Sequence, residues 1–369
     1  MIYFDNSATT PIAPEVIDEI TDCMKNCFGN PSSRHALGLE ASKILSSSRA
    51  QVAKSLSVQP DEIFFTSGGT EGDNIAILGA ANIKKGKRIV TTAVEHPAVL
   101  NTMKHLEQSG FEVVYVMPDS KGQISLDAIA SEITSDTCLV SVMHVNNETG
   151  AIFPVDKIKN VMKTLSPRAL LHVDAVQSFG HIPFKPSLWG IDLASVSSHK
   201  IHGPKGVGAL YVKKGVSLKP SVFGGGQEKN IRSGTENVAG ILGFAKATQL
   251  INYEDALLCA EIKNRLLTSL LKIDGALHNG GGNESPYILN MSFGKVRSEI
   301  MLNALSNEGI YVSSGSACAS GSHKSHVLEA MNAPLTDSAI RFSLSRYNTL
   351  SEADEVINKL CEIEKGLRR

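Results

Sequence analysis

The sequence predicts an α/β protein whose mostly parallel central sheet is flanked by helices, with a smaller α+β unit toward the C-terminus. Through the first two-thirds of the chain, short apolar runs alternate with amphipathic helical stretches, a pattern typical of a parallel sheet covered on both faces. Polar residues follow several of these runs directly, and ligands bind at the carboxyl ends of strands in such sheets. With 369 residues, the chain is long enough for two domains.

The strands of the large sheet are predicted at the short apolar runs, in chain order. They are EIFFTS (62–67), RIVTTAV (88–94), FEVVYV (111–116), CLVSVMHV (138–145), LLHVDAV (170–176), DLASVSS (192–198) and GALYVK (208–213). Helices are expected from about Thr70 and from Pro97 to Ser109. The alternation predicts strands joined by helical crossovers.

The smaller unit follows a helical stretch from about Asn237 to Lys272, which we interpret as a long connector. Further strands are predicted at YILNMSF (287–293), IYVSS (310–314) and AIRFSLS (339–345), with a helix from 298 that ends at Gly309. The last amphipathic helix spans 351–367. Ser351 is expected to be its N-cap, with Asp354 at the capping-box position.

The composition is that of an ordinary soluble protein, with 42% hydrophobic and 20% charged residues. Lys and Arg number 36 against 37 Asp and Glu, so no basic excess indicates a nucleic-acid or membrane-surface partner. The N-terminus lacks the features of a signal peptide, and no apolar run approaches the ~20 residues of a membrane helix. We therefore expect a cytoplasmic protein.

Six cysteines are few for this length, and we expect no disulfide framework. Most are expected to be small buried hydrophobes. Cys23 and Cys27 should share one helix, with Cys23 facing the core, and no further ligands follow at a spacing that suits a metal. Cys318 differs, because it lies in the Gly-, Ser- and Ala-rich run SSGSACASGS.

Lys200 follows the predicted strand 192–198 and precedes a glycine-rich turn. A lysine that forms a Schiff base must lose its proton, which partial desolvation and neighbouring cations promote. Taken alone, Lys200 is better explained as a surface lysine before a turn.

Asp174 and Gln177 come at the end of the apolar run LLHVDAV. A carboxylate at that point needs a partner, and a protonated pyridine nitrogen is a suitable one. An Asp that caps the following helix is the alternative. Upstream, Gly69 and Thr70 begin a helix after a strand, where backbone N–H groups favour an anion such as phosphate.

Two further side chains follow strands directly. His96 is able to stack on an aromatic ring or move a proton near pH 7, although Pro97 also makes it a plausible helix-start residue. Asn147 lies in a stretch with good turn chemistry, so an ordinary turn residue is its alternative.

Cys318 and Arg341 lie in the C-terminal third. An exposed thiol on a flexible tether is a candidate nucleophile, and His323, Lys324 and His326 would favour its thiolate. An incidental loop cysteine is the alternative. Arg341, within a predicted strand, suits bidentate binding of a substrate carboxylate, or else a structural ion pair.

Together these segments resemble one family. From residue 3 to 347 the chain is similar to the cysteine desulfurases of the NifS/IscS type, within the class V aminotransferase-like, fold-type I enzymes that use pyridoxal phosphate. The segments, in the family's order, are YFDNSATTP, FGNPSSRHALG, TSGGTEGDN, AVEHPAV, HVNNETG, HVDAVQS, SSHKIHGPKGVGALYV, GGGQEKNIRSGTEN, SSGSACAS and IRFSLSRY. The lysine segment and the cysteine loop are the most specific.

The resemblance implies a pyridoxal 5'-phosphate site in a large domain, 14–253, and a small domain of 1–13 plus 254–369 that carries the cysteine loop. Lys200 would carry the cofactor, Asp174 would pair with its ring nitrogen, and Gln177 with its ring oxygen. His96 would stack on the ring and serve as acid or base. The phosphate would be held by Gly69, Thr70, Ser197 and His199.

The resemblance also implies a homodimer, in which Thr235 adds a phosphate contact from the second subunit. Asn30, Asn147 and Arg341 would face the substrate, with Asn147 also beside the cofactor and Arg341 on the substrate carboxylate. Cys318 would attack the sulfur of L-cysteine, leaving L-alanine and a persulfide. An iron–sulfur scaffold or a tRNA-thiolation enzyme would accept that sulfur. A selenocysteine lyase or an aminotransferase of the same fold is the alternative activity.

Overall fold

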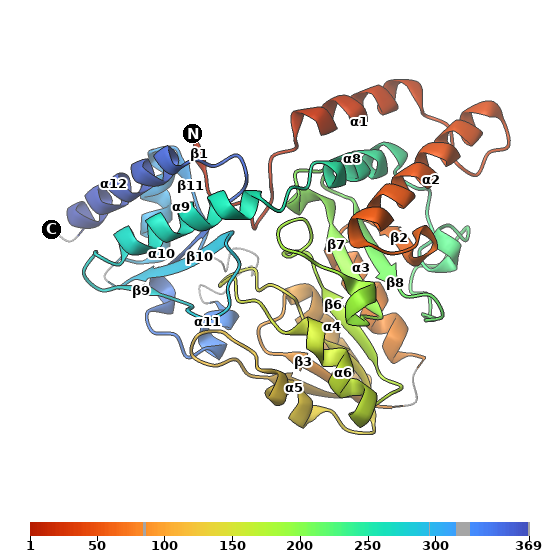
Figure 1. The fold of residues 1–369 in the computed structure, drawn as a ribbon, viewed down its shortest axis with the longest axis horizontal. Helices are drawn as coiled ribbons and strands as arrows, with labels where there is room; N and C mark the ends of the chain where they lie inside the picture. The colour runs from red at the N-terminus through yellow and green to blue at the C-terminus, as the bar shows by residue number, and fades with distance from the viewer. Residues whose placement is uncertain (84–85, 295, 315–324, 368–369) are drawn as a thin grey trace.

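The computed structural model describes residues 1–83, 86–294, 296–314 and 325–367 (Figure 1). Cys318, His323 and Lys324 therefore lie outside the described residues. The predicted α/β fold with a mostly parallel sheet is confirmed. Across the described chain, no helix has the combination of length and hydrophobicity that a membrane span requires.

The large sheet has seven strands in the order β2-β8-β7-β6-β5-β3-β4. Six of them, β2, β7, β6, β5, β3 and β4, share one direction, whereas β8 is antiparallel to both of its neighbours, β7 and β2. The strands are β2 Ile63–Thr66, β3 Arg88–Thr92, β4 Glu112–Val116, β5 Thr137–Ser141, β6 Leu170–Asp174, β7 Leu193–Ser197 and β8 Gly208–Val212. β4 ends where its apolar run predicted, and the other six strands end one to four residues before the ends of theirs.

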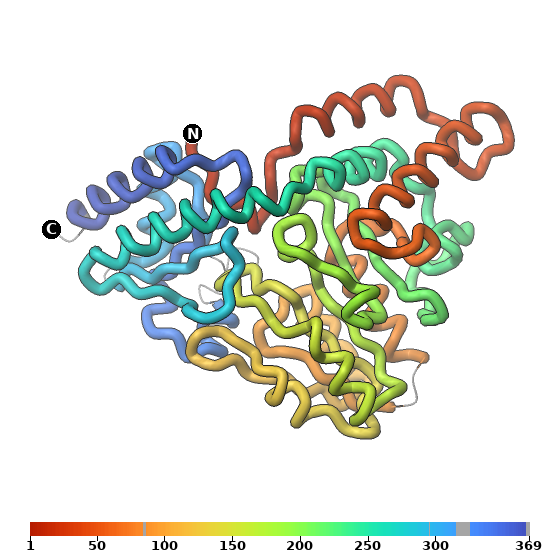
Figure 2. The backbone as a smooth tube through the Cα atoms, in the orientation of Figure 1, coloured from red at the N-terminus to blue at the C-terminus, as the bar shows by residue number. Residues whose placement is uncertain are grey.

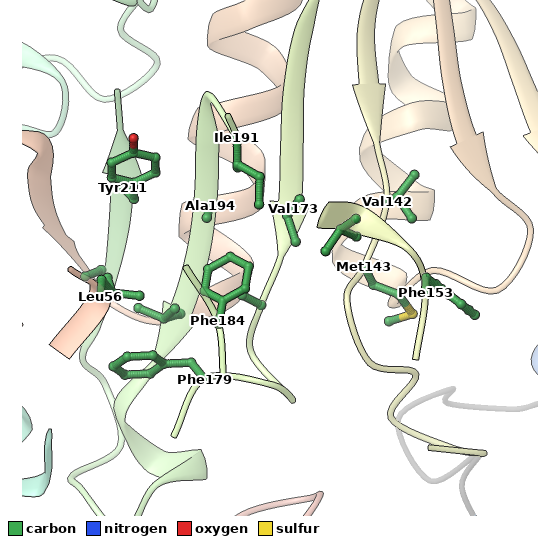
Figure 3. Packing of buried hydrophobic residues seen from close by; sticks show 14 of the residues in the cluster. Leu56, Val142, Met143, Phe153, Val173, Phe179, Phe184, Ile191, Ala194 and Tyr211 are labelled. Carbon is green, nitrogen blue, oxygen red and sulfur yellow. The ribbon is translucent and has the colours of Figure 1, made fainter. Parts of the chain in front are cut away.

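Most residues on both faces of this sheet are buried, which explains why apolar residues dominate its strands, although polar residues such as His172 in β6 and Ser195 in β7 interrupt them. Successive residues of β8 point to opposite cores: Ala209 and Tyr211 join one cluster, while Leu210 and Val212 join the other. Figure 3 shows part of the first cluster, including Val173 of β6, Ala194 of β7 and Tyr211 of β8.

Helices cover the two faces of the large sheet and connect it to the smaller unit. Their bounds are α1 Pro14–Asn26, α2 Ala36–Leu56, α3 Gly69–Ala81, α4 Pro97–Gln108, α5 Leu126–Glu132, α6 Val155–Leu165, α7 Pro186–Trp189, α8 Val238–Gln249, α9 Asp255–Leu270, α10 Ser298–Asn307, α11 His326–Ala330 and α12 Leu350–Leu367. Cys23 is buried on α1 as expected, and Cys27 forms the C-cap of that helix.

The smaller unit contains an antiparallel sheet in the order β12-β10-β9 and a parallel pair, β1 with β11. These strands are β1 Ile2–Tyr3, β9 Ala276–His278, β10 Ile288–Phe293, β11 Ile310–Tyr311 and β12 Ala339–Ser343. A separate hydrophobic core joins Ile2 and Phe4 to residues of α9, β10 and α12. Figure 2 shows the N-terminal trace leaving this unit and running to the large sheet. The domain boundary at residue 253 stays a prediction.

Two local predictions are wrong. The helical stretch 237–272 is not continuous, because α8 ends at Gln249 and α9 begins at Asp255. Ser351 is not the N-cap of α12, which already begins at Leu350. Instead, Thr349 and Glu352 form the reciprocal capping box: Glu352 Oε2 accepts from the Thr349 N–H at 2.8 Å, and Thr349 Oγ1 accepts from the Glu352 N–H at 3.2 Å.

Candidate active site

The carboxyl edge of the large sheet brings together three of the residues that the sequence singled out. Asp174 is the last residue of β6, Lys200 ends the short 3-10 helix Ser198–Lys200 after β7, and His96 follows β3 as the N-cap of α4. Their charges interact: Lys200 contributes to the lowered pKa of His96 and counteracts the raised pKa of Asp174. A lysine amine, a buried carboxylate and an imidazole thus lie together at one edge of the sheet.

The Lys200 amine is held by the N-terminal segment. Its Nζ donates hydrogen bonds to the backbone carbonyls of Ser7 and Ala8, the latter at 2.8 Å. Gln177 Nε2 also donates to the Ser7 carbonyl, at 2.9 Å. Lys200 is half-buried, and residues nearly two hundred positions earlier in the chain bind its amine.

Asp174 is buried without a cationic partner in direct contact among the described residues. The Val176 N–H donates to its Oδ1 at 2.9 Å, a contact within the turn that follows β6; no helix begins there in the described chain, so Asp174 does not cap one. Burial, with a further contribution from the charge of Asp73, raises the pKa of Asp174 to about 7. A cation placed against this carboxylate would lower that pKa again, so the site fits a protonated ring nitrogen.

A buried polar cluster of Asp73, His172 and Ser195 lies near Asp174, and the sequence did not predict it. His172, two residues earlier on β6, places Nε2 3.4 Å from Asp73 Oδ1 and 3.3 Å from Ser195 Oγ. Burial raises the pKa of Asp73 to about 7 and lowers that of His172 to about 4. Because α3 carries Asp73 and β6 carries His172, only the tertiary packing shows that they meet.

His96 is a neutral imidazole at physiological pH. Burial is the main cause that lowers its pKa to about 4, with smaller contributions from Lys200 and His326. Its Nδ1 accepts a hydrogen bond from the Ala98 N–H at 3.1 Å, so His96 caps α4, which is the alternative that the sequence left open. A neutral ring is able to accept a proton from a thiol.

The predicted phosphate cradle lies between α3 and the end of β7. Ser197 Oγ is buried there and has no hydrogen-bond partner within the described chain. A buried hydroxyl without a partner is available to donate a hydrogen bond to a bound anion. A Cβ at Gly69 would approach Val176 Cγ2 to 2.5 Å, so a larger residue there would require the Val176 side chain to shift. Thr70 is exposed beside it, and His199 Nδ1 lies 3.2 Å from Thr9 Oγ1.

His199 is a further neutral ring at this end of the sheet. Burial, followed by the charges of Lys200 and Lys205, lowers its pKa to about 4. Together with the unpartnered Ser197 hydroxyl and the N-terminus of α3, it forms a donor set that fits a phosphate group.

Arg341 is buried in β12 and points toward the same edge. Its Nη2 lies 2.8 Å from Asp5 Oδ1, and its Nη1 donates to the Asn147 carbonyl at 2.9 Å. Its Nε is buried and lacks a partner within the described residues. The ion pair with Asp5 is the structural alternative that the sequence left open, and the unpaired Nε–H leaves donor capacity for a ligand.

Two predicted residues lie elsewhere in the chain. Asn30 is exposed in the connection between α1 and α2, where its Oδ1 accepts from the Ser32 N–H at 2.9 Å. Thr235 is exposed and borders a cavity of about 60 Å³ with Ser67 and Gly206. The roles expected of Asn30 at the substrate and of Thr235 at the phosphate of a second subunit therefore stay predictions.

The described residues that flank 315–324 are anchored beside the site. Ser313 exchanges backbone hydrogen bonds with Arg341, at 2.6 and 3.2 Å. On the other side, Ser325 Oγ donates to the buried carboxylate of Glu148, and His326 Nε2 lies 3.0 Å from the carbonyl oxygen of Glu95. Both ends of the segment that includes Cys318 are thus fixed close to Arg341 and His96.

Comparison with known proteins agrees with this geometry. The model of the class-V aminotransferase family matches residues 2–356. The chain belongs to the class-V aminotransferase family. A cysteine desulfurase of Nostoc sp. is 45% identical, with 100% of this chain and 94% of the relative aligned.

Two solved structures show how closely this chain follows its relatives. A NifS-like protein superposes with a TM-score of 0.92 at 41% identity, covering 100% of this chain and 99% of that one. A structure of SspA in complex with cysteine gives a TM-score of 0.84 at 32% identity, covering 95% and 100%. The resemblance to cysteine desulfurases and the fold-type I architecture are thereby confirmed.

Proposed function

We propose that this chain is a pyridoxal-phosphate-dependent cysteine desulfurase that converts L-cysteine to L-alanine and retains the sulfur as a persulfide on Cys318. The convergence of Lys200, Asp174 and His96 at one edge of the sheet carries the proposal. Full-length relatives named cysteine desulfurase support the reaction, and the relative solved with cysteine supports the substrate.

When bound, pyridoxal phosphate supplies an electron-poor ring that stabilises negative charge at the substrate α-carbon. In this proposal Lys200 attaches the group and moves the α-proton, while Asp174 keeps the ring nitrogen protonated. Gly69, Thr70, Ser197 and His199 hold the phosphate, and Gln177 is directed to the ring oxygen. The neutral His96 takes the thiol proton.

Arg341 and Asn147 bind the substrate side, with the Arg341 guanidinium on the carboxylate. The Cys318 thiolate then attacks the substrate sulfur: a new S–S bond forms, the substrate C–S bond breaks, and its electron pair stays on the carbon that becomes the methyl of alanine. The sulfur afterwards passes to an acceptor protein, for which an iron–sulfur scaffold and a tRNA-thiolation enzyme are the candidates. The cytoplasm stays the predicted compartment.

A homodimer belongs to the same proposal. Large apolar side chains are exposed on and near α1 and α2, including Phe28 at 75% and Met24 at 69%, and Phe223 is 82% exposed on the segment that leads to Thr235. A second copy that covers this surface would bring Thr235 to its partner's phosphate site. Light scattering of the purified protein tests the dimer.

The deciding experiment gives the purified protein L-cysteine without any reductant. We expect stoichiometric L-alanine and one added sulfur atom on the peptide that contains Cys318, measured by mass spectrometry. Alanine formation with the sulfur on another cysteine, or no alanine at all from cofactor-saturated protein, would contradict the proposal.

A further inference from the structure

The N-terminal segment Asp5–Ala8 links the two ends of the candidate active site. At one end, Asp5 Oδ1 lies 2.8 Å from Arg341 Nη2. At the other, the carbonyls of Ser7 and Ala8 accept hydrogen bonds from the Lys200 amine. Four consecutive residues therefore contact both the guanidinium assigned to a carboxylate and the amine assigned to the cofactor.

The backbone of this segment is fixed against β12. Asp5 forms a parallel bridge with Ser343, whose carbonyl accepts from the Asn6 N–H at 3.2 Å. The Ser7 N–H donates to Ser343 Oγ at 2.9 Å. Because Ser343 lies two residues after Arg341 on the same strand, the Asp5 carboxylate is held at a set position relative to the guanidinium.

The Arg341 guanidinium is oriented by two acceptors and retains free donors. A guanidinium carries five N–H groups in a rigid plane. Here Asp5 and the Asn147 carbonyl occupy one N–H on each of the two terminal nitrogens, and the buried Nε–H is unpaired within the described chain. The arginine side chain is 5% exposed against 22% for Asp5, so the pair lies at the inner wall of the site.

We propose that Asp5 is a positioning residue that fixes the Arg341 guanidinium to receive the α-carboxylate of the ligand, so that the site selects α-amino acids over simple amines. The inference rests on the proposed function and adds to it a determinant of substrate class. Orientation is the benefit, because a guanidinium held in place loses less rotational freedom when a carboxylate binds.

A competing interpretation makes Asp5 a rival for the guanidinium, which the ligand carboxylate must displace. The two interpretations predict opposite changes in the affinity for an α-amino acid when the Asp5 carboxylate is removed. If Asp5 positions Arg341, removing its carboxylate weakens binding of an α-amino acid. If Asp5 competes, the same change strengthens binding.

The test titrates the cofactor-saturated holoenzyme with L-alanine and with ethylamine, which differs by lacking the carboxylate, and follows the cofactor absorbance. For Asp5→Ala we expect the dissociation constant of L-alanine to rise about tenfold, the effect of losing one charge-assisted hydrogen bond, while that of ethylamine is unchanged. Asp5→Asn keeps an acceptor oxygen and should stay within about threefold of the native value. Asp354→Ala, which removes the partner of Arg265 on the exposed face of α12, is the matched control.

Tighter L-alanine binding by either Asp5 variant, or an equal change for both ligands, would overturn the inference. Asp5→Asn keeps the test decisive if Asp5→Ala proves unstable, because competition predicts tighter binding for Asn as well. A native protein whose absorbance responds to neither ligand would instead remove the proposed function, so the two failures are distinguishable.

Discussion

Gln177 and Lys200 donate hydrogen bonds to the same backbone carbonyl, that of Ser7. Gln177 comes from the loop after β6 and Lys200 from the 3-10 helix after β7, so a single acceptor from the N-terminal segment joins two adjacent strand ends. The amine that would attach the cofactor and the amide that would contact its ring oxygen are thereby held in one frame.

Lys200→Ala should abolish covalent attachment of pyridoxal phosphate while the fold remains. Borohydride reduction of the native protein should fix the cofactor to the Lys200 peptide, and the variant should lose it on dialysis. Mass spectrometry of the digested protein measures both. Lys205→Ala, an exposed lysine in the same turn, is the control and should behave as the native protein does. Cofactor fixed to another lysine in the native chain would disprove the assignment.

Cys318→Ala should reduce L-alanine formation from L-cysteine by at least about a thousandfold, as expected for loss of a nucleophile. The cofactor absorbance should be unchanged, because the thiol has no part in binding it. Cys361→Ala, which alters a half-buried cysteine on α12, should retain full turnover. Persistent turnover in the Cys318 variant would require a different sulfur acceptor.

Asp73→Asn should change how the stability of the cofactor-free protein depends on pH. Burial raises the pKa of Asp73 to about 7 in the folded chain, above the value of about 3.9 for an unfolded aspartate. The stability from its protonated form is therefore complete below about pH 4 and is lost as the pH rises through 7.

The neutral Asn variant escapes this loss, so its free energy of unfolding should exceed the native value increasingly from pH 4 to 8, by at most on the order of 4 kcal/mol. Chemical denaturation at each pH measures the difference. Asp18→Asn, an exposed position on α1, should show no such trend. An advantage of Asp73→Asn that shrinks as the pH rises would mean that Asp73 is ionised and paired in the folded chain.

Gly69→Ala should weaken cofactor binding and destabilise the fold by about 1–3 kcal/mol, because the new methyl group overlaps the Val176 side chain. Thermal unfolding and cofactor titration measure the two effects. Gly366→Ala on α12 meets no atom within 4 Å, so it should be neutral or stabilise the helix by up to about 1 kcal/mol. Equal behaviour of the two variants would show that Gly69 is not needed for close packing.

The sequence predicted the parts of the site that follow individual strands. Asp174 and Lys200 stand directly after apolar runs, and the carboxyl edge of a parallel sheet necessarily gathers such residues. It did not predict contacts that depend on long-range packing. The Ser7 carbonyl is a backbone group with no signature in the residue letters, and the Asp73–His172 approach depends on how α3 lies on β6 and β7.

Local competition explains the boundaries that were wrong. Thr349 with Glu352 and Ser351 with Asp354 are both capping pairs by residue type. The structure forms the first pair, because α12 begins at Leu350 after β12. The sequence predicted the strand β8 but not that it is antiparallel to its neighbours, because a strand buried on both faces has the same apolar composition in either direction.

The pairing of β1 with β11, and of Asp5 with Ser343, has a consequence for synthesis of the protein on the ribosome. The N-terminal segment cannot pair with β11 and Ser343 until more than three hundred further residues have been translated. The candidate site therefore forms only after β12 has been translated, and a cofactor that depends on these contacts would bind after that point and not before it.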